Sequence, residues 1–189
     1  MRENKLKTFM MVLISLMVVI VLYTIAVCSI FYRKIDMPIM VAVPSDYNKV
    51  YNQLVREYDY DMEYERGKEQ YKNMIEEQLG LKAYMYLEKS ICIDYDGYMI
   101  AGIRLMVVDK DLSLYDYCVV FAHESLHFTK FSSNDTYINY EVFKFLYENE
   151  DEELKNIGID FAIRQLAGKY GGRYNCSSYI VNYFVSRHR

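Results

Sequence analysis

The sequence predicts an α+β protein, in which an N-terminal transmembrane helix precedes a small, mostly helical domain with a short antiparallel sheet or hairpin. Three observations favour this class. Residues 8–32 form one uncharged, strongly apolar run of 25 residues. Most later segments repeat apolar residues at spacings of three and four, as helices with one buried face do. The segment 90–109 instead gathers β-branched and apolar residues around an Asp-Gly pair, which is typical of a hairpin.

The apolar run at residues 8–32 has the length of a membrane-spanning helix. About 20 apolar residues cross a bilayer, whereas the apolar part of a cleaved secretory signal usually has about 7 to 15. A long cleaved signal is one alternative. A lipoprotein signal ending at Cys28 is another, but such a signal needs a small residue before the cysteine, and Val27 is not small. We therefore expect a retained single-pass anchor.

The charges beside this run predict the orientation of the chain. Arg2, Lys5 and Lys7 precede the run, and only Arg33 and Lys34 follow it closely. The positive-inside rule then places the N-terminus in the cytoplasm and the domain that follows the run outside it. We expect residues 1–34 to form a cytoplasmic stub and anchor, residues 35–44 a short linker, and residues 45–189 a single domain.

The composition of the chain narrows its partners. With a net charge of -4 and basic residues scattered among acidic ones, the chain gives no electrostatic reason to expect nucleic-acid binding. Outside the apolar run, Cys92, Cys118 and Cys176 are an odd number of cysteines and do not resemble a disulfide framework. We expect their thiols to be reduced and structural.

Capping residues and apolar spacing predict the elements before the central helix. Residues 45–80 have the pattern of a pair of helices, with Ser45 as a cap and Gly80 as a stop. Residues 90–109 predict a hairpin that reverses at Asp96-Gly97. Ser113 then caps a helix over residues 114–130.

Three more helices are predicted after residue 130. The run Ser132-Ser133-Asn134-Asp135 offers caps for a helix over residues 136–149. Acidic residues at 150–153 begin the next helix, which ends near Gly171-Gly172. The last helix begins near Ser177.

Two of the three histidines lie in one motif, His123-Glu124-Ser125-Leu126-His127. Residues four apart stand one turn apart on the same face of a helix, so both imidazoles can reach one metal ion. The glutamate beside the first histidine can then reach a water molecule on that ion. The predicted helix 114–130 carries the whole motif.

This HExxH pattern resembles the signature of the zincin metallopeptidases. A catalytic zinc usually has three protein ligands and leaves a fourth position to water. The metzincin extension needs a glycine and a histidine where this chain has Lys130 and Ser133, so that subclass is excluded. The pattern is closer to the gluzincins, in which a glutamate from a downstream helix completes a His/His/Glu site. The resemblance covers residues 113–148 only.

Glu141 is the third ligand that this resemblance favours. Glu148 lies two turns further along the same predicted helix, and Asp135 lies nearer the preceding loop, so either can replace Glu141. The sequence therefore predicts a Zn2+ site formed by His123, His127 and one downstream carboxylate.

The resemblance implies a zinc-dependent metallopeptidase that hydrolyses amide bonds. Zinc lowers the pKa of its water to about 7, and Glu124 acts as the general base that moves the proton to the leaving amine. A hairpin before the helix fits a cleft that binds an extended main chain, which favours peptide or protein substrates, including peptidoglycan peptides. Tyr170, Arg173 and Tyr174 are candidates to stabilise the oxyanion.

A membrane-tethered protein-interaction module is the competing hypothesis. Its surface would use some of the 21 tyrosines, and the histidines would be incidental or would hold a structural metal ion. An intramembrane protease is excluded, because residues 117–128 are too short and too polar in their surroundings to cross a bilayer.

Overall fold

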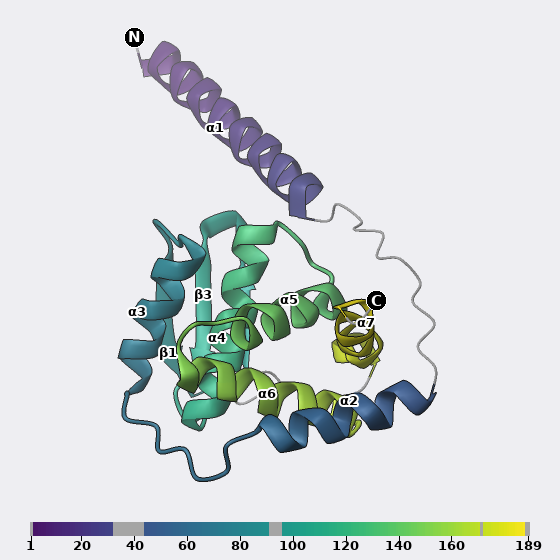
Figure 1. Cartoon of the computed structure of the whole chain (residues 1–189). Helices are drawn as coiled ribbons and strands as arrows, with labels where there is room; N and C mark the ends of the chain where they lie inside the picture. Colours follow the sequence, from purple (N-terminus) through teal and green to yellow (C-terminus); the bar gives the residue numbers. More distant parts are fainter. Residues whose placement is uncertain (1, 32–43, 91–95, 171, 188–189) are drawn as a thin grey trace.

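The computed structural model describes residues 2–31, 44–90, 96–170 and 172–187 (Figure 1). These residues form a mostly helical fold with one small sheet. The helices are α1 (Arg2–Phe31), α2 (Pro44–Glu57), α3 (Lys68–Leu79), α4 (Leu114–Lys130), α5 (Asp135–Tyr147), α6 (Glu152–Leu166) and α7 (Ser177–Arg187). The strands are β1 (Met85–Lys89), β2 (Gly97–Ile100) and β3 (Leu105–Asp109), and two short 3-10 helices are η1 (Ala101–Ile103) and η2 (Gly172–Tyr174).

Helix α1 projects from the rest of the molecule (Figure 1). Its stretch Phe9–Ala26 has a mean hydropathy of 2.7 and is not buried in the structure. The helix is therefore long and apolar enough to cross a membrane, as predicted. The linker predicted at residues 35–44 lies outside the described residues, except that Pro44 begins α2. The orientation of the chain in a membrane stays a prediction.

The three strands form one mixed sheet in the order β1-β3-β2. Strand β1 pairs with β3 in parallel, and β2 pairs with β3 antiparallel. Met106, Val107 and Val108 of β3 are fully buried, because β3 is the central strand and is covered on both faces. The β2–β3 pair confirms a short antiparallel element before the HExxH helix.

The turn of the antiparallel strand pair does not lie at Asp96-Gly97, where it was predicted. Gly97 begins β2, and the chain turns instead at η1 and Arg104, whose φ is 50°. Strand β1 lies before the predicted hairpin and was not expected. Residues 91–95, in which the first arm was predicted, lie outside the described residues.

Packing explains why Gly97 is a glycine. A Cβ atom there would lie 2.7 Å from Cγ1 of Val120, 3.1 Å from the carbonyl oxygen of Val107 and 3.5 Å from Cγ of Glu124. The missing side chain lets β2 approach α4 closely beside the motif. Gly97 therefore marks a close contact between β2 and α4.

The two helices predicted between residues 45 and 80 pack on different partners. Helix α2 lies against α6 and α7, whereas α3 lies against α4. Helix α3 begins at Lys68. It ends at Gly80, whose φ of 64° is the left-handed conformation common after a helix, as expected for a stop.

Helix α4 has the bounds predicted from the sequence. The Ser113 hydroxyl accepts a hydrogen bond from the backbone N–H of Asp116 at 3.1 Å and donates one to its carboxylate at 2.6 Å. Helix α4 contacts β2, β3, α3, α5 and α6, so it is the central element of the domain. Its motif is held on several sides by packing. Cys118 in α4 and Cys176 are buried and reduced, whereas Cys92 is outside the described residues.

Helices α5 and α6 meet at Gly158. A Cβ atom on this residue would lie 2.5 Å from the backbone nitrogen of Tyr147 and 2.8 Å from the carbonyl carbon of Leu146. Only glycine allows this approach without a shift of the backbone. This packing holds the end of α5 against α6, while α5 also lies against α4.

Candidate metal centre

His123 and His127 face each other on one side of α4. Their ring centroids are 4.6 Å apart, and their Nε2 atoms are 2.9 Å apart. The helical spacing of four residues produces this arrangement, as predicted. The side chains are 12% and 9% exposed, so the pair lies largely inside the fold.

Asp135 brings a carboxylate to the two imidazoles. After α4 the chain turns through Phe131, which has a φ of 49°, and α5 begins with Asp135. Its Oδ1 atom is 3.4 Å from Nε2 of His127 and 3.7 Å from Nε2 of His123. His123, His127 and Asp135 therefore form a group that could hold a metal ion.

The spacing of these three atoms fits a small ion with tetrahedral ligands. Two ligand atoms at the usual zinc distances of about 2.0 to 2.1 Å and a tetrahedral angle lie about 3.3 Å apart. The three measured separations, 2.9, 3.4 and 3.7 Å, are close to this value. Shifts of a few tenths of an ångström in the side chains would complete the geometry.

Glu141, the favoured third ligand, does not join this group. Its carboxylate lies 2.8 Å from Nζ of Lys130 and 3.4 Å from Nζ of Lys144. Glu141 is six residues beyond Asp135 on the same helix, which moves it about 9 Å along the axis. We correct the choice of carboxylate from Glu141 to Asp135, one of the two alternatives.

Glu148, the other alternative, is also engaged elsewhere. Its carboxylate accepts a hydrogen bond of 2.6 Å from the Tyr183 hydroxyl and pairs with the guanidinium of Arg187. Both contacts tie the end of α5 to α7. Glu148 therefore has a role in helix packing.

Two further groups orient the imidazoles. Nδ1 of His127 lies 2.5 Å from the carbonyl oxygen of Ser132, and Nδ1 of His123 lies 2.8 Å from Oδ1 of Asn139. Both oxygens are acceptors, so each Nδ1 carries the proton and donates. In the neutral ring, Nε2 then has the free lone pair that a metal ion needs.

Asn139 was not identified from the sequence, although a signal was present. It stands one turn after Asp135 on the same face of α5 and is buried as a polar residue among apolar ones. Its Nδ2 atom donates to the carbonyl oxygen of Tyr174 at 2.7 Å. A polar side chain within the apolar stripe of a helix beside the motif is the pattern to look for.

The charges of the group shift its pKa values. Burial raises the pKa of Asp135, but hydrogen bonds from His123 and His127 outweigh burial and hold that pKa well below its usual range. Burial lowers the pKa of His127, but the hydrogen bond with Asp135 and the charge of Glu124 outweigh burial, so the pKa is raised. Asp135 and His127 therefore stabilise each other's charged forms.

Glu124 lies beside this group and is 7% exposed. Burial is the largest influence and raises the pKa of its carboxyl, against the opposing charges of His123 and His127. A carboxylate with a raised pKa is a more effective proton acceptor near neutral pH. The close passage of Gly97 over its Cγ atom places β2 next to the same side chain.

The residues suggested for oxyanion stabilisation have different surroundings. The backbone carbonyl of Tyr174 accepts a hydrogen bond from Asn139, which also contacts His123. Tyr170 packs on Phe161, with ring centroids 5.6 Å apart. The side chain of Arg173 lies outside the description. Between the two described tyrosines, the backbone of Tyr174 has the contact that leads to the histidines.

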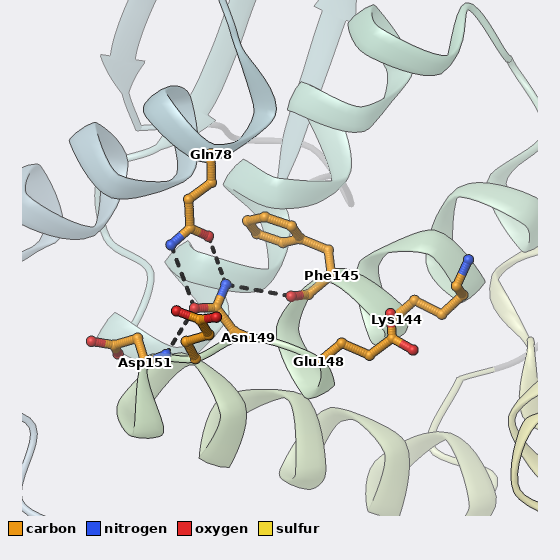
Figure 2. Close-up of a pocket in the computed structure, with 7 residues that line it drawn as sticks. Gln78, Lys144, Phe145, Glu148, Asn149 and Asp151 are labelled. Carbon is orange, nitrogen blue, oxygen red and sulfur yellow. Dashed lines mark hydrogen bonds between the residues drawn. The ribbon is translucent and has the colours of Figure 1, made fainter. Parts of the chain in front are cut away.

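A separate hollow lies between α3 and the end of α5 (Figure 2). In it, the amide groups of Gln78 and Asn149 exchange two hydrogen bonds of 3.4 and 2.6 Å. No residue of the HExxH motif lines this hollow. The hollow is therefore distinct from the candidate metal centre.

No protein-family model matches this chain, and the comparisons with curated proteins and with solved structures give no match.

Proposed function

We propose that this protein is a membrane-anchored zinc metallopeptidase. One observation supports the proposal above the others: two imidazole nitrogens and one carboxylate oxygen converge within 4.8 Å of one another, and the buried Glu124 lies beside them. Two nitrogen ligands and one oxygen ligand form a donor set that zinc accepts.

The number of ligands favours catalysis over a purely structural metal. Structural zinc sites usually have four protein ligands, whereas catalytic sites have three and keep one position for water. Among the described residues, the group contains three ligands. This count supports the peptidase over the interaction module with a structural ion.

Each residue has a defined task in this proposal. His123, His127 and Asp135 would hold the ion, while Asn139 and the Ser132 carbonyl fix the ring orientations. A bound zinc would lower the pKa of its water and polarise the substrate carbonyl. Glu124 accepts the proton of the water and delivers it to the departing amine.

The position of strand β2 favours one class of substrate. It lies at the edge of the described sheet and passes beside Glu124 at Gly97. An extended peptide can pair with such an edge through its main chain, which would bring the scissile amide next to the ion. Peptides and proteins are therefore the expected substrates, including the peptides of peptidoglycan.

Metal content and cleavage by matched variants test this proposal. The full-length chain, purified in detergent micelles, should contain about one zinc per molecule. It should cleave members of a mixed peptide library at neutral pH. Glu124→Gln should keep the zinc but lower the cleavage rate by about 10²- to 10⁴-fold, because a general base is lost.

Glu141→Gln is the matched control, since it removes a glutamate that contacts two lysines. This variant should keep both zinc and cleavage. Absence of zinc from the wild-type chain, or unchanged cleavage by Glu124→Gln, would overturn the proposal.

A further inference from the structure

One end of the sheet carries exposed apolar side chains. Met85 and Ile100 both pair with Leu105 at the start of β3, and η1 connects β2 to β3 at this end. Met85, Ile100 and Ile103 are 51%, 44% and 55% exposed, and Phe131 after α4 is 49% exposed. We call these four residues, Met85, Ile100, Ile103 and Phe131, the apolar tip.

Arg104 connects the parts of the apolar tip. Its guanidinium donates to the carbonyl oxygens of Lys82 and Ala83, both at 2.9 Å. The same group lies 5.4 Å from the ring centroid of Phe128, in the last turn of α4. The start of β1, η1 and the end of α4 are therefore braced together at one end of the domain.

The backbone at this end has an unusual conformation. Among the described residues, the non-glycine residues with positive φ are Ala83, Arg104 and Phe131, at 51°, 50° and 49°. Side chains with a Cβ atom adopt this region rarely, because it brings Cβ close to the backbone. Such strained residues cluster where function requires a particular shape.

Three basic residues lie near the apolar tip, and one of them, Lys130, pairs with Glu141 at 2.8 Å. The segments 81–86, 99–105 and 128–134 contain Lys82, Arg104 and Lys130 but no acidic residue, although the chain has 26. Exposed apolar side chains beside basic ones are typical of surfaces that enter the interface of an anionic bilayer. The tip therefore complements a lipid surface in both polarity and charge.

Helix α1 lies next to the apolar tip, so a membrane that α1 crosses would lie near this surface. It contacts η1, and Figure 1 shows its C-terminal end close to this end of the domain. We propose that the apolar tip inserts into the interfacial layer of the membrane that α1 crosses. This inference depends on α1 spanning a membrane and is independent of the peptidase proposal.

Tryptophan fluorescence tests this insertion directly, since the chain has no tryptophan. Ile103→Trp would be made in the full-length chain, reconstituted into vesicles with or without lipids brominated on their acyl chains. Bromine should reduce its fluorescence by about half or more, and the emission should shift to shorter wavelength, because the ring lies among lipid chains. Phe131→Trp should behave alike and is the second probe should Ile103→Trp lower stability.

Tyr60→Trp is the matched control. Tyr60 is 69% exposed and belongs to the connection between α2 and α3. Figure 1 shows this connection at the opposite end of the domain. Its replacement should give a water-exposed emission without quenching. Equal quenching of the control and the tip variants would overturn the inference. A shift to shorter wavelength without quenching by brominated lipid would also overturn it, since protein, such as a second copy, would then cover the tip.

Discussion

The side-chain oxygen of Asn139 lies 2.8 Å from Nδ1 of His123, although the two residues are 16 positions apart and on different helices. Through Nδ2, the same amide donates to the carbonyl oxygen of Tyr174. Asn139 thus fixes one imidazole of the candidate metal centre and connects it to η2. The amide oxygen of Asn139 accepts from His123 and its nitrogen donates to Tyr174, so these two partners define the orientation of the amide.

Asn139→Leu should therefore weaken zinc binding. The variant keeps a similar side-chain size but removes the acceptor of His123, and loss of such an outer partner usually costs about 10- to 100-fold in metal affinity. Competition with a fluorescent chelator measures this change. Asn182→Leu is the control, because the Asn182 amide donates to the Ser178 carbonyl on its own helix, α7. Equal affinity in both variants would contradict the role of Asn139.

Asp135→Asn should remove zinc from the protein, whereas Glu141→Gln should not. An amide oxygen is a weaker zinc ligand than a carboxylate, and Asp135 has the carboxylate closest to both histidines. The loss should exceed the about 10- to 100-fold cost of removing an outer partner. Metal analysis after dialysis compares the two variants. Retention of zinc by Asp135→Asn and its loss from Glu141→Gln would restore the original choice of ligand.

The stabilisation by zinc should increase with pH. The raised pKa of His127 means that, with zinc chelated, its protonated form stabilises the fold below about pH 6.5, and this contribution is lost as pH rises. Zinc requires the neutral ring, so protons compete with it at low pH. The difference in Tm between zinc-loaded and chelated protein should therefore grow from about pH 5.5 to about pH 8.

His127→Ala provides the control for this pH dependence. Without the imidazole, zinc should add little to Tm at any of these pH values. A Tm difference in the wild-type chain that does not vary with pH would contradict the competition between protons and metal.

Gly158→Ala should destabilise the protein. In a helix interior, alanine is favoured over glycine by about 1 kcal/mol. Here, however, the new Cβ would meet backbone atoms of α5 at 2.5 and 2.8 Å, and such overpacking usually costs about 1 to 3 kcal/mol or more. Because backbone cannot yield as a flexible side chain does, the clash should outweigh the helix preference.

Chemical denaturation of Gly158→Ala and Gly102→Ala measures this difference. A Cβ at Gly102 meets nothing within 4 Å, so this control should change the free energy of unfolding by less than about 0.5 kcal/mol. A stabilised Gly158→Ala variant would show that α5 and α6 can separate without cost.

Several features follow from short stretches of sequence. The apolar helix, the Ser113 cap with α4 behind it, and the pairing of His123 with His127 each depend on residues a few positions apart. Local spacing is sufficient for them, because the geometry of a helix fixes where residues three and four apart point. The Asp96-Gly97 pair shows the limit of this reasoning. The sequence alone does not distinguish a glycine that is needed for close packing from one that is needed in the turn of a strand pair.

The sequence by itself determined that two histidines and a glutamate share one helical face after a long apolar helix. Only the tertiary structure decided that Asp135, and not Glu141, approaches the two imidazoles. The choice depends on the turn at Phe131, which has a left-handed backbone conformation that an aromatic residue does not predict. A change of direction between two helices moves every later side chain, whereas spacing along one helix is unaffected by it.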